Sequence, residues 1–395
     1  MIDKINLAKT AQSFATPCFV FDEDELTSRI AEVLGLLGNI PLCYSIKANP
    51  FLVETLIPVV DRFEVCSPGE LSICRSLLVP PEKIIYSGVL KEEEDTKEAI
   101  EYGCAILTAE SVRQFELIRK TASLLGRKVN VLLRLSSGNQ FGMSLEDIKM
   151  LLDDPVPEIS IIGLHYFAGT QRKILKKQQA ELARLTEVII ELREKFDTDL
   201  PMLEYGPGLP FPYFTDEDFS DTLLPLKTIS DDLKKTAGCC ALSVEMGRFL
   251  ASSCGYYITK IGDLKSSSEA NWCITDGGIN HVNYLGQMMG MKTPVITHCQ
   301  IGEPVDDSEG ETYTICGALC TTNDILVRSL TLKDPVPGDI LIFSNIGAYS
   351  VTEGIGLFLS RALPRVIMHK KNCDRLVRDA TQSWKINVKD TNNIL

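Results

Sequence analysis

The segment PLCYSIKANP, residues 41–50, begins the part of the chain that decides the fold. It joins a short apolar run, 40–46, to a lysine, Lys47, and the run has the length of a buried strand. Further short apolar runs follow along the chain, at 63–66, 84–87, 105–108, 129–135, 159–166, 202–205 and 241–245. The chain therefore contains eight candidate strands before residue 250.

Longer stretches with helical periodicity separate these runs. The clearest are 68–78, 92–102, 111–125, 173–196 and 218–236. Short strands that alternate with helices are typical of parallel sheets with right-handed crossovers. Eight such units in about 210 residues fit a (β/α)8 barrel. We therefore predict an α/β protein with a TIM barrel over residues 24–254.

The sequence after the barrel predicts a second domain of a different kind. Its β-rich segments lie at 256–264, 272–275, 295–299, 313–316, 340–343 and 362–368, with turn residues such as Asp276-Gly277-Gly278 between them. This pattern of short β-rich segments separated by turn residues is typical of antiparallel β structure. We predict a sandwich or barrel-like β domain formed by residues 1–23 and 255–395, in which an N-terminal strand at 17–21 takes part.

Composition excludes several classes of function. The chain of 395 residues carries a net charge of −13 without a basic cluster, so nucleic acid and anionic membranes are not expected partners. No apolar run reaches the about 18–20 residues of a transmembrane helix, and the N-terminus lacks the apolar core of a signal peptide. The thirteen cysteines and four histidines have no metal-ligand or disulfide-framework spacing. We expect a cytoplasmic protein without a metal.

In a TIM barrel the active residues lie at the carboxyl ends of the strands. Polar residues at these positions are Lys47, Glu64, Arg134, His165, the turn 206–208, Glu245 and Arg248. A lysine, a glycine-rich turn that can bind phosphate and a carboxylate for a ring nitrogen are the anchoring points of pyridoxal phosphate. The alternatives are that Lys47 forms an ordinary ion pair and that Glu245 and Arg248 form a surface pair one helical turn apart.

Six short motifs indicate, in addition, a resemblance of this chain to a known protein family. They are YSIKAN (44–49), FEVCSPGEL (63–71), EMGR (245–248), DGG (276–278), GALC (317–320) and GAY (347–349). In this order and at these separations the chain resembles the fold-type III pyridoxal-phosphate-dependent decarboxylases, the diaminopimelate and ornithine decarboxylase family. The resemblance runs from about residue 17 to residue 364.

The resemblance implies a role for each matching residue. Lys47 would form the Schiff base with the cofactor, Glu245 would keep the pyridine nitrogen protonated, and Cys320 would reach in from the partner subunit of a homodimer to protonate the substrate carbon. The implied cofactor-binding set is Lys47, Glu64, Arg134, Phe167, Thr170, Gly206, Gly208, Glu245, Arg248 and Tyr349. The alternatives are a buried thiol for Cys320 and a packed strand residue for Tyr349.

Three positions depart from the family's usual pattern around the cofactor. In the run HYFAGTQ, 165–171, Phe167 takes the place of the histidine that stacks on the cofactor ring, and Thr170 replaces a serine. An aromatic ring can still stack on pyridine. Pro207 interrupts the usual run of three glycines and removes one backbone N–H. The six residues between Arg134 and Phe141 make a shorter loop than in most relatives.

The expected substrate site also departs from the housekeeping enzymes. Thr321 stands where an acidic residue usually follows the cysteine, and Tyr284 stands where diaminopimelate decarboxylases have an arginine. A site that lacks groups to pair with distal charges loses its means of selecting for them. The predicted substrate-binding residues are His165, Asp276, Tyr284, Thr321 and Asp324. For His165 a purely structural role is the alternative.

These observations predict a pyridoxal-phosphate-dependent amino acid α-decarboxylase that works as a homodimer with shared active sites. Its substrate would be an amino acid, or an amino-acid derivative carried on an acyl-carrier protein. The motifs are most similar to a subgroup of specialised pathways that includes the carrier-protein-linked glutamate decarboxylase of butirosin biosynthesis. The alternatives are an amino acid racemase of the same fold, a diaminopimelate- or ornithine-type decarboxylase with an altered substrate site, and a non-catalytic regulator.

Overall fold

The computed structural model describes residues 2–287 and 289–388, which group into two compact units. One unit is formed by the described residues of Met1–Ser28, Pro212–Ser220 and Leu250–Leu395. The other is formed by Arg29–Phe211 and Asp221–Phe249. Within the described residues, no helix is long and apolar enough to cross a membrane.

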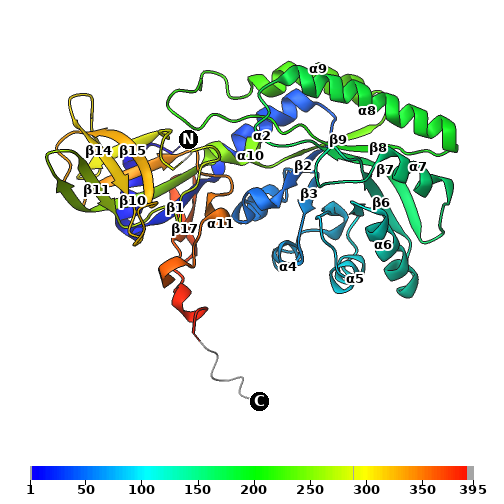
Figure 1. Ribbon diagram of the computed structural model, residues 1–395, viewed down its shortest axis with the longest axis horizontal. Coiled ribbons are helices and arrows are strands. Elements are labelled where there is room, and N and C mark those ends of the chain that lie inside the picture. Colours follow the sequence, from blue (N-terminus) through cyan, green and yellow to red (C-terminus); the bar gives the residue numbers. More distant parts are fainter. Residues whose placement is uncertain (1, 288, 389–395) are drawn as a thin grey trace, which may run out of the picture. The chain divides into compact units, whose positions relative to one another are not determined.

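The second of these, the barrel unit, contains a closed barrel of eight parallel strands (Figure 1). They are β2 (Leu42–Ser45), β3 (Arg62–Val65), β4 (Ile84–Tyr86), β5 (Ile106–Ala109), β6 (Val129–Arg134), β7 (Ile159–Phe167), β8 (Met202–Gly206) and β9 (Ala241–Met246). Each pairs with the next, and β9 pairs with β2 to close the ring. The eight predicted strands and the predicted barrel are confirmed.

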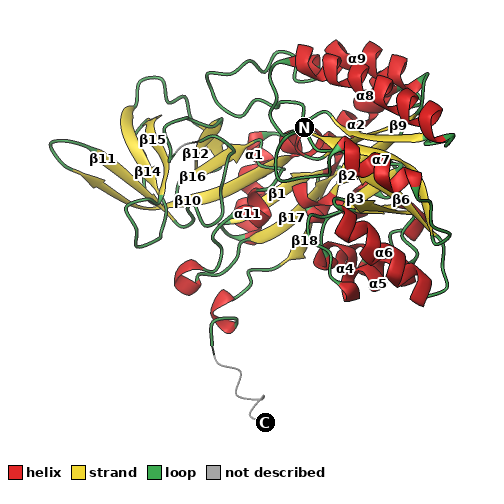
Figure 2. Ribbon diagram, turned by 45° about the vertical axis from the view of Figure 1, so that its right-hand side comes forward, coloured by secondary structure: helices red, strands yellow, loops and turns green. Residues whose placement is uncertain are grey.

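Helices precede, connect or follow the barrel strands, and the connecting helices lie around the outside of the barrel (Figure 2). They are α2 (Glu23–Leu37), α3 (Val53–Leu56), α4 (Pro68–Ser76), α5 (Glu93–Tyr102), α6 (Val112–Leu124), α7 (Leu145–Asp153), α8 (Leu175–Phe196), α9 (Leu224–Ala237) and α10 (Arg248–Ala251). Serines cap several of them: Ser67 accepts a hydrogen bond from the amide of Glu70, and Ser111 accepts one from that of Gln114.

One predicted helix begins later than expected. The sequence pattern predicts a helix from residue 218, but α9 begins at Leu224. The carboxylates of Asp218 and Asp221 accept hydrogen bonds from the amides of Ser220 and Leu223. These local side-chain bonds compete with the helical pattern, so the segment forms turns.

In its described residues, the first unit, the β unit, contains a sheet of ten strands, coloured yellow with the other strands in Figure 2. They are β1 (Cys18–Asp22), β10 (Gly255–Ser266), β11 (Asn271–Thr275), β12 (Ile296–Gln300), β13 (Glu303–Pro304), β14 (Glu311–Cys316), β15 (Ile325–Leu332), β16 (Ile340–Ser344), β17 (Arg365–Lys370) and β18 (Cys373–Arg378). The N-terminal strand β1 pairs with β10 and β17, as predicted. The sheet is mostly antiparallel, and β1–β17 and β11–β14 are parallel pairs.

The β unit also contains elements that the sequence pattern did not predict. Helix α1 (Lys4–Phe14) is capped by Asp3, whose carboxylate accepts a hydrogen bond from the amide of Asn6, and buried residues of the helix pack on the sheet. A single turn, α11 (Ser350–Glu353), follows Tyr349. Strand β17 starts at Arg365 rather than at residue 362. Pro364 directly precedes it and has no N–H to donate to the ladder.

Candidate active site

A pocket of about 260 Å³ opens at the carboxyl ends of the barrel strands. Its lining residues all come from the barrel unit: Lys47, Glu64, Cys66, Gly88, Val89, Glu110, Arg134, Phe141, His165, Phe167 and Glu245. Parallel strands of one barrel bring their ends to the same rim, so residues distant in sequence meet here. The pocket contains Lys47 and five further residues that the sequence singled out.

Lys47 lies in a single 3-10 turn, Ile46–Ala48, directly after β2. Its Nζ forms an ion pair with Glu64 and lies 3.6 Å from Oε1 of Glu245. It also lies 3.5 Å from Sγ of Cys66, and its side chain is 36% exposed. Lys47 is therefore both ion-paired and open to the pocket, so the ordinary ion-pair reading and a chemical role are compatible.

Glu245 is buried and hydrogen-bonded on both oxygens. Ser45 donates to Oε1 at 2.8 Å, and Nε2 of His165 lies 3.1 Å from Oε2. Burial alone would raise the pKa of Glu245, but Lys47 and the contact with His165 outweigh it and hold the pKa well below its ordinary value. Arg248 is buried as well, so the surface-pair reading of Glu245 and Arg248 is wrong.

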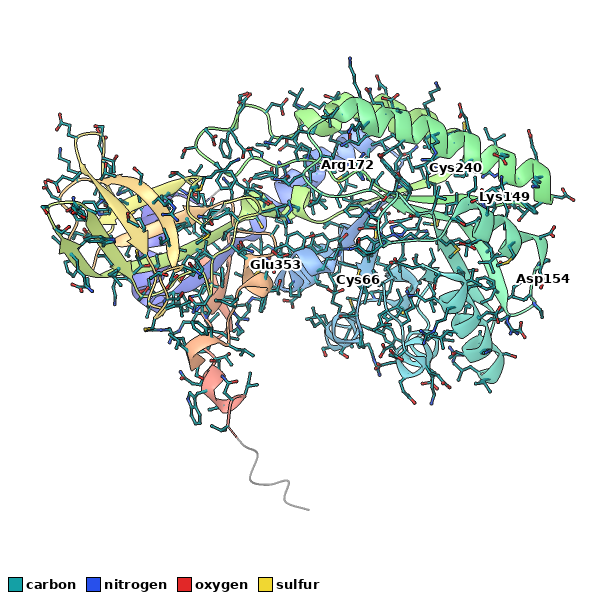
Figure 3. All side chains as sticks on the ribbon, viewed as in Figure 1. Cys66, Lys149, Asp154, Arg172, Cys240 and Glu353 are labelled. Atoms are coloured by element: carbon teal, nitrogen blue, oxygen red, sulfur yellow. The ribbon has the colours of Figure 1, made fainter. Side chains whose placement is uncertain are left out.

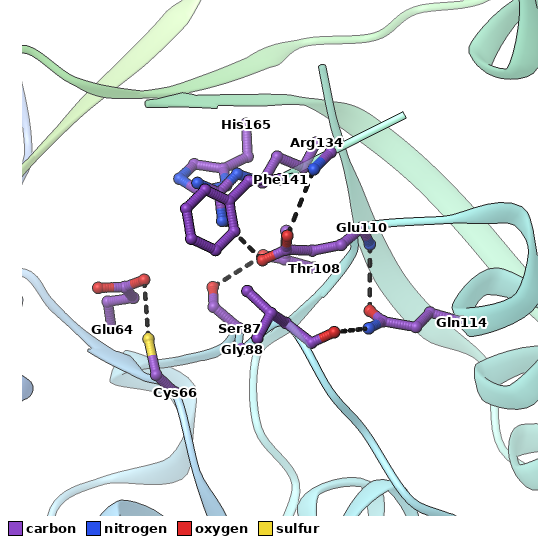
Figure 4. Close-up of polar contacts among 12 residues, drawn as sticks. Glu64, Cys66, Ser87, Gly88, Thr108, Glu110, Gln114, Arg134, Phe141 and His165 are labelled. Carbon is purple, nitrogen blue, oxygen red and sulfur yellow. Dashed lines mark hydrogen bonds and ion pairs between the residues drawn. The ribbon is translucent and has the colours of Figure 1, made fainter. Parts of the chain in front are cut away.

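A second charged group forms one wall of the pocket (Figure 4). Arg134 donates to Oε1 of Glu110 at 2.6 Å, and the pair is almost fully buried. The ring of Phe141 covers the guanidinium at 4.8 Å, and the amide of Gly142 donates to Oε2 of Glu110 at 3.4 Å. Since Arg134 is fixed by a carboxylate, it is less available to the cofactor than its position at a strand end suggests.

Buried side chains brace the loop beside this wall. Gln114 accepts from the amide of Glu110 at 3.1 Å and donates to the carbonyl of Val89 at 2.8 Å. Lys91 donates to the carbonyl of Gly88 at 2.8 Å, and burial lowers the pKa of its ammonium to about 8. Gly88 and Val89 are pocket residues, so the loop that carries them is held from behind.

Sequence reasoning missed some residues of the pocket. Cys66, labelled in Figure 3, lies within the quoted motif FEVCSPGEL and donates to Glu64 at 3.1 Å. Burial raises the pKa of this thiol well above its ordinary value. Glu110 lies two residues after the fourth apolar run, 105–108. Both lie at strand ends, which was the available signal.

The turn after β8 has the shape of a phosphate cradle. Gly208 has a φ of +61°, and a Cβ there would lie 1.8 Å from the carbonyl oxygen of Gly169. A Cβ on Gly206 would lie 2.5 Å from the ring of Phe167. Arg248 donates to the hydroxyl of Thr170 at 3.3 Å. Backbone amides of a tight glycine turn, a hydroxyl and a buried guanidinium fit a phosphate group.

The other predicted site residues belong to the β unit. Cys320 is exposed, contrary to the buried-thiol alternative. Tyr349 precedes α11 and has a φ of +70°, a left-handed backbone conformation that is rare for a tyrosine. Thr321 follows Cys320 in the same turn, where its amide donates to the carbonyl of Leu319 at 2.9 Å.

Three predicted substrate residues use their polar atoms within the β unit. Asp276 accepts hydrogen bonds from the hydroxyls of Thr16 and Thr259, both at 2.6 Å. Asp324 accepts from the amides of Ile279 at 2.9 Å and Leu319 at 2.7 Å, and so joins the DGG and GALC turns. The hydroxyl of Tyr284 donates to the carbonyl of Ser344 at 2.6 Å. These bonds give the residues structural roles, and their contact with substrate stays a prediction.

Comparison with known proteins places the chain among enzymes. The profile "Pyridoxal-dependent decarboxylase, pyridoxal binding domain" matches residues 23–252. Diaminopimelate decarboxylase of Methanocaldococcus jannaschii is 25% identical over 96% of this chain and 92% of that protein. L-glutamyl-[BtrI acyl-carrier protein] decarboxylase of Niallia circulans is also 25% identical, over 95% of this chain and 94% of that protein.

Solved structures have the same fold. The crystal structure of diaminopimelate decarboxylase from M. jannaschii superimposes with a TM-score of 0.85 at 23% identity, and covers 98% of this chain and 95% of that chain. Lysine/ornithine decarboxylase from Vibrio vulnificus gives 0.75 at 22% identity, over 87% and 92%. The profile covers more than half of the chain, and the lysine, the anionic Glu245 and the glycine cradle fit pyridoxal phosphate. This chain therefore belongs to the pyridoxal-dependent decarboxylase family.

Proposed function

We propose that the protein removes the α-carboxyl group of an amino acid or of an amino-acid derivative. The observation that carries this proposal is the position of Lys47 at the open end of the barrel, between Glu64 and the anionic Glu245. Pyridoxal phosphate, when bound to a lysine, supplies an electron sink for the electron pair left on Cα when carbon dioxide departs. The residues of the barrel unit would hold that sink in place.

Each part of the pocket has a role in this proposal. Lys47 would bind the cofactor covalently, and Glu245 would face the pyridine nitrogen and keep it protonated. Phe167, which packs on Gly206 and lines the pocket, would stack on the ring. The cradle described above, formed by Gly206, Gly208, Thr170 and Arg248, would bind the phosphate. Tyr349 would add a phosphate contact from the β unit.

Cys320 would donate the proton that replaces the carboxyl group. Its exposure in the β unit supports a role at a surface shared with another protein chain. In this proposal two chains form a homodimer, and Cys320 of each chain serves the pocket of its partner. The enzyme would be cytoplasmic.

The substrate would be an amino acid without a distal charge, either free or bound to a carrier protein. One relative is named for diaminopimelate and another for a glutamyl group on an acyl-carrier protein. Thr321 offers no charge, and Asp276 and Asp324 already accept hydrogen bonds within the β unit. These features favour the uncharged substrate class.

The test compares Lys47→Ala with the wild type and with Lys149→Ala. Lys149 pairs with Glu191 on the helical surface of the barrel unit, so its loss should leave the pocket intact. We expect wild type and Lys149→Ala to show Schiff-base absorbance with pyridoxal phosphate and to release labelled carbon dioxide from a substrate. Lys47→Ala should lose both. Absorbance that persists in Lys47→Ala would refute the role of Lys47, and turnover without carbon dioxide would favour the racemase.

A further inference from the structure

Three side chains of the pocket form a closed triangle of contacts. Lys47 follows β2, whereas Glu64 lies in β3 and Cys66 directly follows that strand. Oε2 of Glu64 pairs with the ammonium of Lys47, and Oε1, the other oxygen, accepts a hydrogen bond from the thiol of Cys66 at 3.1 Å (Figure 4). The third side is the distance of 3.5 Å between Nζ of Lys47 and Sγ of Cys66. Each of the three residues therefore contacts the other two.

The backbone holds Cys66 in place independently of Glu64. Residues two apart in an extended chain point to the same face, and the side chains of both Glu64 and Cys66 line the pocket. The amide of Cys66 donates to Oε2 of Glu70 at 2.7 Å. On the other side, the carbonyl of Cys66 faces Gly88, where a Cβ would lie only 2.4 Å from this oxygen. A thiol that is fixed by its own backbone can in turn fix the carboxylate beside it.

The thiol of Cys66 has the properties of a hydrogen-bond donor. Burial, followed by the carboxylate of Glu64, raises the pKa of Cys66 well above its ordinary value. Lys47 acts in the opposite direction, and Glu70 adds to the rise. The thiol therefore keeps its proton at neutral pH and can donate a hydrogen bond to Glu64. Nucleophilic cysteines need a lowered pKa, so the contacts favour a hydrogen-bonding role over a nucleophilic one.

The orientation of Glu64 matters to both Lys47 and Glu245, which the proposed function assigns to the cofactor. Glu245 lies 3.6 Å from the same ammonium. Burial would raise its pKa, but Lys47, His165 and Glu64 together hold this pKa well below its ordinary value. A glutamate side chain has several rotatable bonds, and an ion pair to one oxygen leaves its carboxylate free to turn. The thiol bond to the second oxygen of Glu64 restricts this rotation.

We propose that Cys66 is a positioning residue, whose thiol fixes the carboxylate of Glu64 in the orientation that pairs with Lys47. The inference deepens the proposed function and rests on its assignment of Lys47 as the lysine that binds the cofactor. Cys66 acts on Lys47 through Glu64. When a substrate amine displaces Lys47 from the cofactor, the ammonium of Lys47 returns to a carboxylate that is already in place. No side chain has to reorient first, which is the advantage of a preorganised site.

The test measures how firmly the ammonium of Lys47 is held in the cofactor-free full chain. The protein is labelled with a trace of acetic anhydride at one fixed pH, and mass spectrometry gives the acetylation of Lys47 relative to that of Lys149, which pairs with Glu191 on the surface. Only a neutral amine reacts, so labelling rises when the ammonium is held less firmly. We expect the ratio to rise about tenfold in Cys66→Ala, the effect of one lost hydrogen bond to a charged group. It should stay at the wild-type value in Cys66→Ser, whose hydroxyl can still donate.

A second set of variants tests whether Cys66 acts through Glu64. Glu64→Gln should raise the labelling of Lys47 by itself, and Cys66→Ala in the same chain should add no further rise, because two changes on one route are not additive. Cys104→Ala is the matched control, since it truncates a buried thiol before β5 and outside the pocket, and it should label like wild type. Equal ratios in wild type and Cys66→Ala, an equal rise in Cys66→Ala and Cys66→Ser, or additive effects with Glu64→Gln would overturn the proposal. If Cys66→Ala fails to fold, Cys66→Val removes the same donor and takes its place.

A cofactor measurement separates this inference from the proposed function. Wild type is mixed with pyridoxal phosphate, and its Schiff-base absorbance is recorded beside the labelling of the cofactor-free chain. We expect absorbance in wild type together with the rise of labelling in Cys66→Ala. Absorbance in wild type with equal labelling of wild type and Cys66→Ala would overturn the role of Cys66 and leave the proposed function standing. No absorbance in wild type would count against the proposed function instead, because the labelling needs no cofactor.

Discussion

Two buried carboxyl groups on neighbouring strands hold opposite charge states because their contacts differ. Glu245 has an ammonium at 3.6 Å and hydrogen bonds on both oxygens, so it is anionic. For Glu204, burial and the charge of Glu245 outweigh the Ser243 hydroxyl, His165 and Arg62, so its pKa rises to about 7 and its protonated form is favoured. Pairs of acids whose environments drive their pKa values apart divide the work of a site between them. Here Glu245 would face the cofactor as an anion, and Glu204 would stay protonated up to about neutral pH.

The raised pKa of Glu204 predicts a pH dependence of stability. Folding raises its pKa from 4.5 to about 7, so the folded state holds a proton that the unfolded state releases in this range. The stability from this proton is complete below pH 4.5 and is lost as the pH rises to about 7. The loss amounts to about 3 kcal/mol. Urea unfolding should therefore show wild type losing this stability relative to Glu204→Gln.

The control for this prediction is Glu110→Gln, which removes a buried carboxylate that is paired with Arg134. Breaking one partner of a buried ion pair costs about 3–5 kcal/mol. We expect Glu110→Gln to be less stable than wild type and to keep the decline between acid and neutral pH. A decline of equal size in Glu204→Gln would contradict the assignment.

At the scale of single residues, the sequence predicted the ends of strands but not the pairs between them. Lys47, Glu245 and His165 follow or end apolar runs, so their place at the barrel rim could be read from the pattern. The ion pair between Arg134 and Glu110 could not be predicted, because it depends on how side chains of adjacent strands turn toward each other. Glu204 looked like part of an apolar run, and only its burial beside Glu245 in the structure distinguishes it.

At the scale of elements, the buried strands of the barrel could be predicted from the sequence, whereas exposed strands at the edge of the β sheet could not. The barrel strands are short, apolar and buried on both faces, so each stands out in the sequence. Strand β15 carries exposed Arg328 and Ser329 in its middle, and β18 is largely exposed. Such strands at the margin of a sheet lack an apolar run, so they were missed.

The glycine turn after β8 supports a prediction about cofactor binding. Gly208 and Gly126 have nearly the same φ, +61° and +60°, but a Cβ meets the Gly169 carbonyl at 1.8 Å in the first and nothing within 4 Å in the second. An alanine at either position destabilises the folded protein by about 1–2 kcal/mol, because its Cβ disfavours the left-handed backbone. Only Gly208→Ala should also displace the cradle and weaken the binding of pyridoxal phosphate.

Titration of the cofactor-free proteins with pyridoxal phosphate checks this, with circular dichroism as the measure of folding. We expect Gly126→Ala to bind like wild type and Gly208→Ala to bind at least tenfold more weakly, a loss of about 1.4 kcal/mol. Equal affinity in the two variants would mean that the turn does not hold the phosphate.

At the scale of the whole molecule, the proposed homodimer predicts complementation. Lys47→Ala and Cys320→Ala should each be inactive alone, because each lacks one part of every site. Mixed and allowed to exchange subunits, they should form hybrid dimers in which one of the two sites has both residues. We expect a statistical mixture to recover about a quarter of the wild-type rate, since half of its dimers are hybrids with one complete site. No recovery despite subunit exchange would place Lys47 and Cys320 in the site of one chain.

The net charge of −13 bears on the choice between a free and a carrier-bound substrate. Acyl-carrier proteins are acidic, so a carrier would meet an enzyme of like charge, and added salt would screen the repulsion. Raising the ionic strength from about 0.01 M to about 0.15 M shortens the Debye length from about 30 Å to about 8 Å. We expect kcat/KM for an aminoacyl carrier protein to rise over this range, while kcat/KM for the same free amino acid stays constant. A fall for the carrier would mean that it docks on a basic surface patch, which the sequence does not predict.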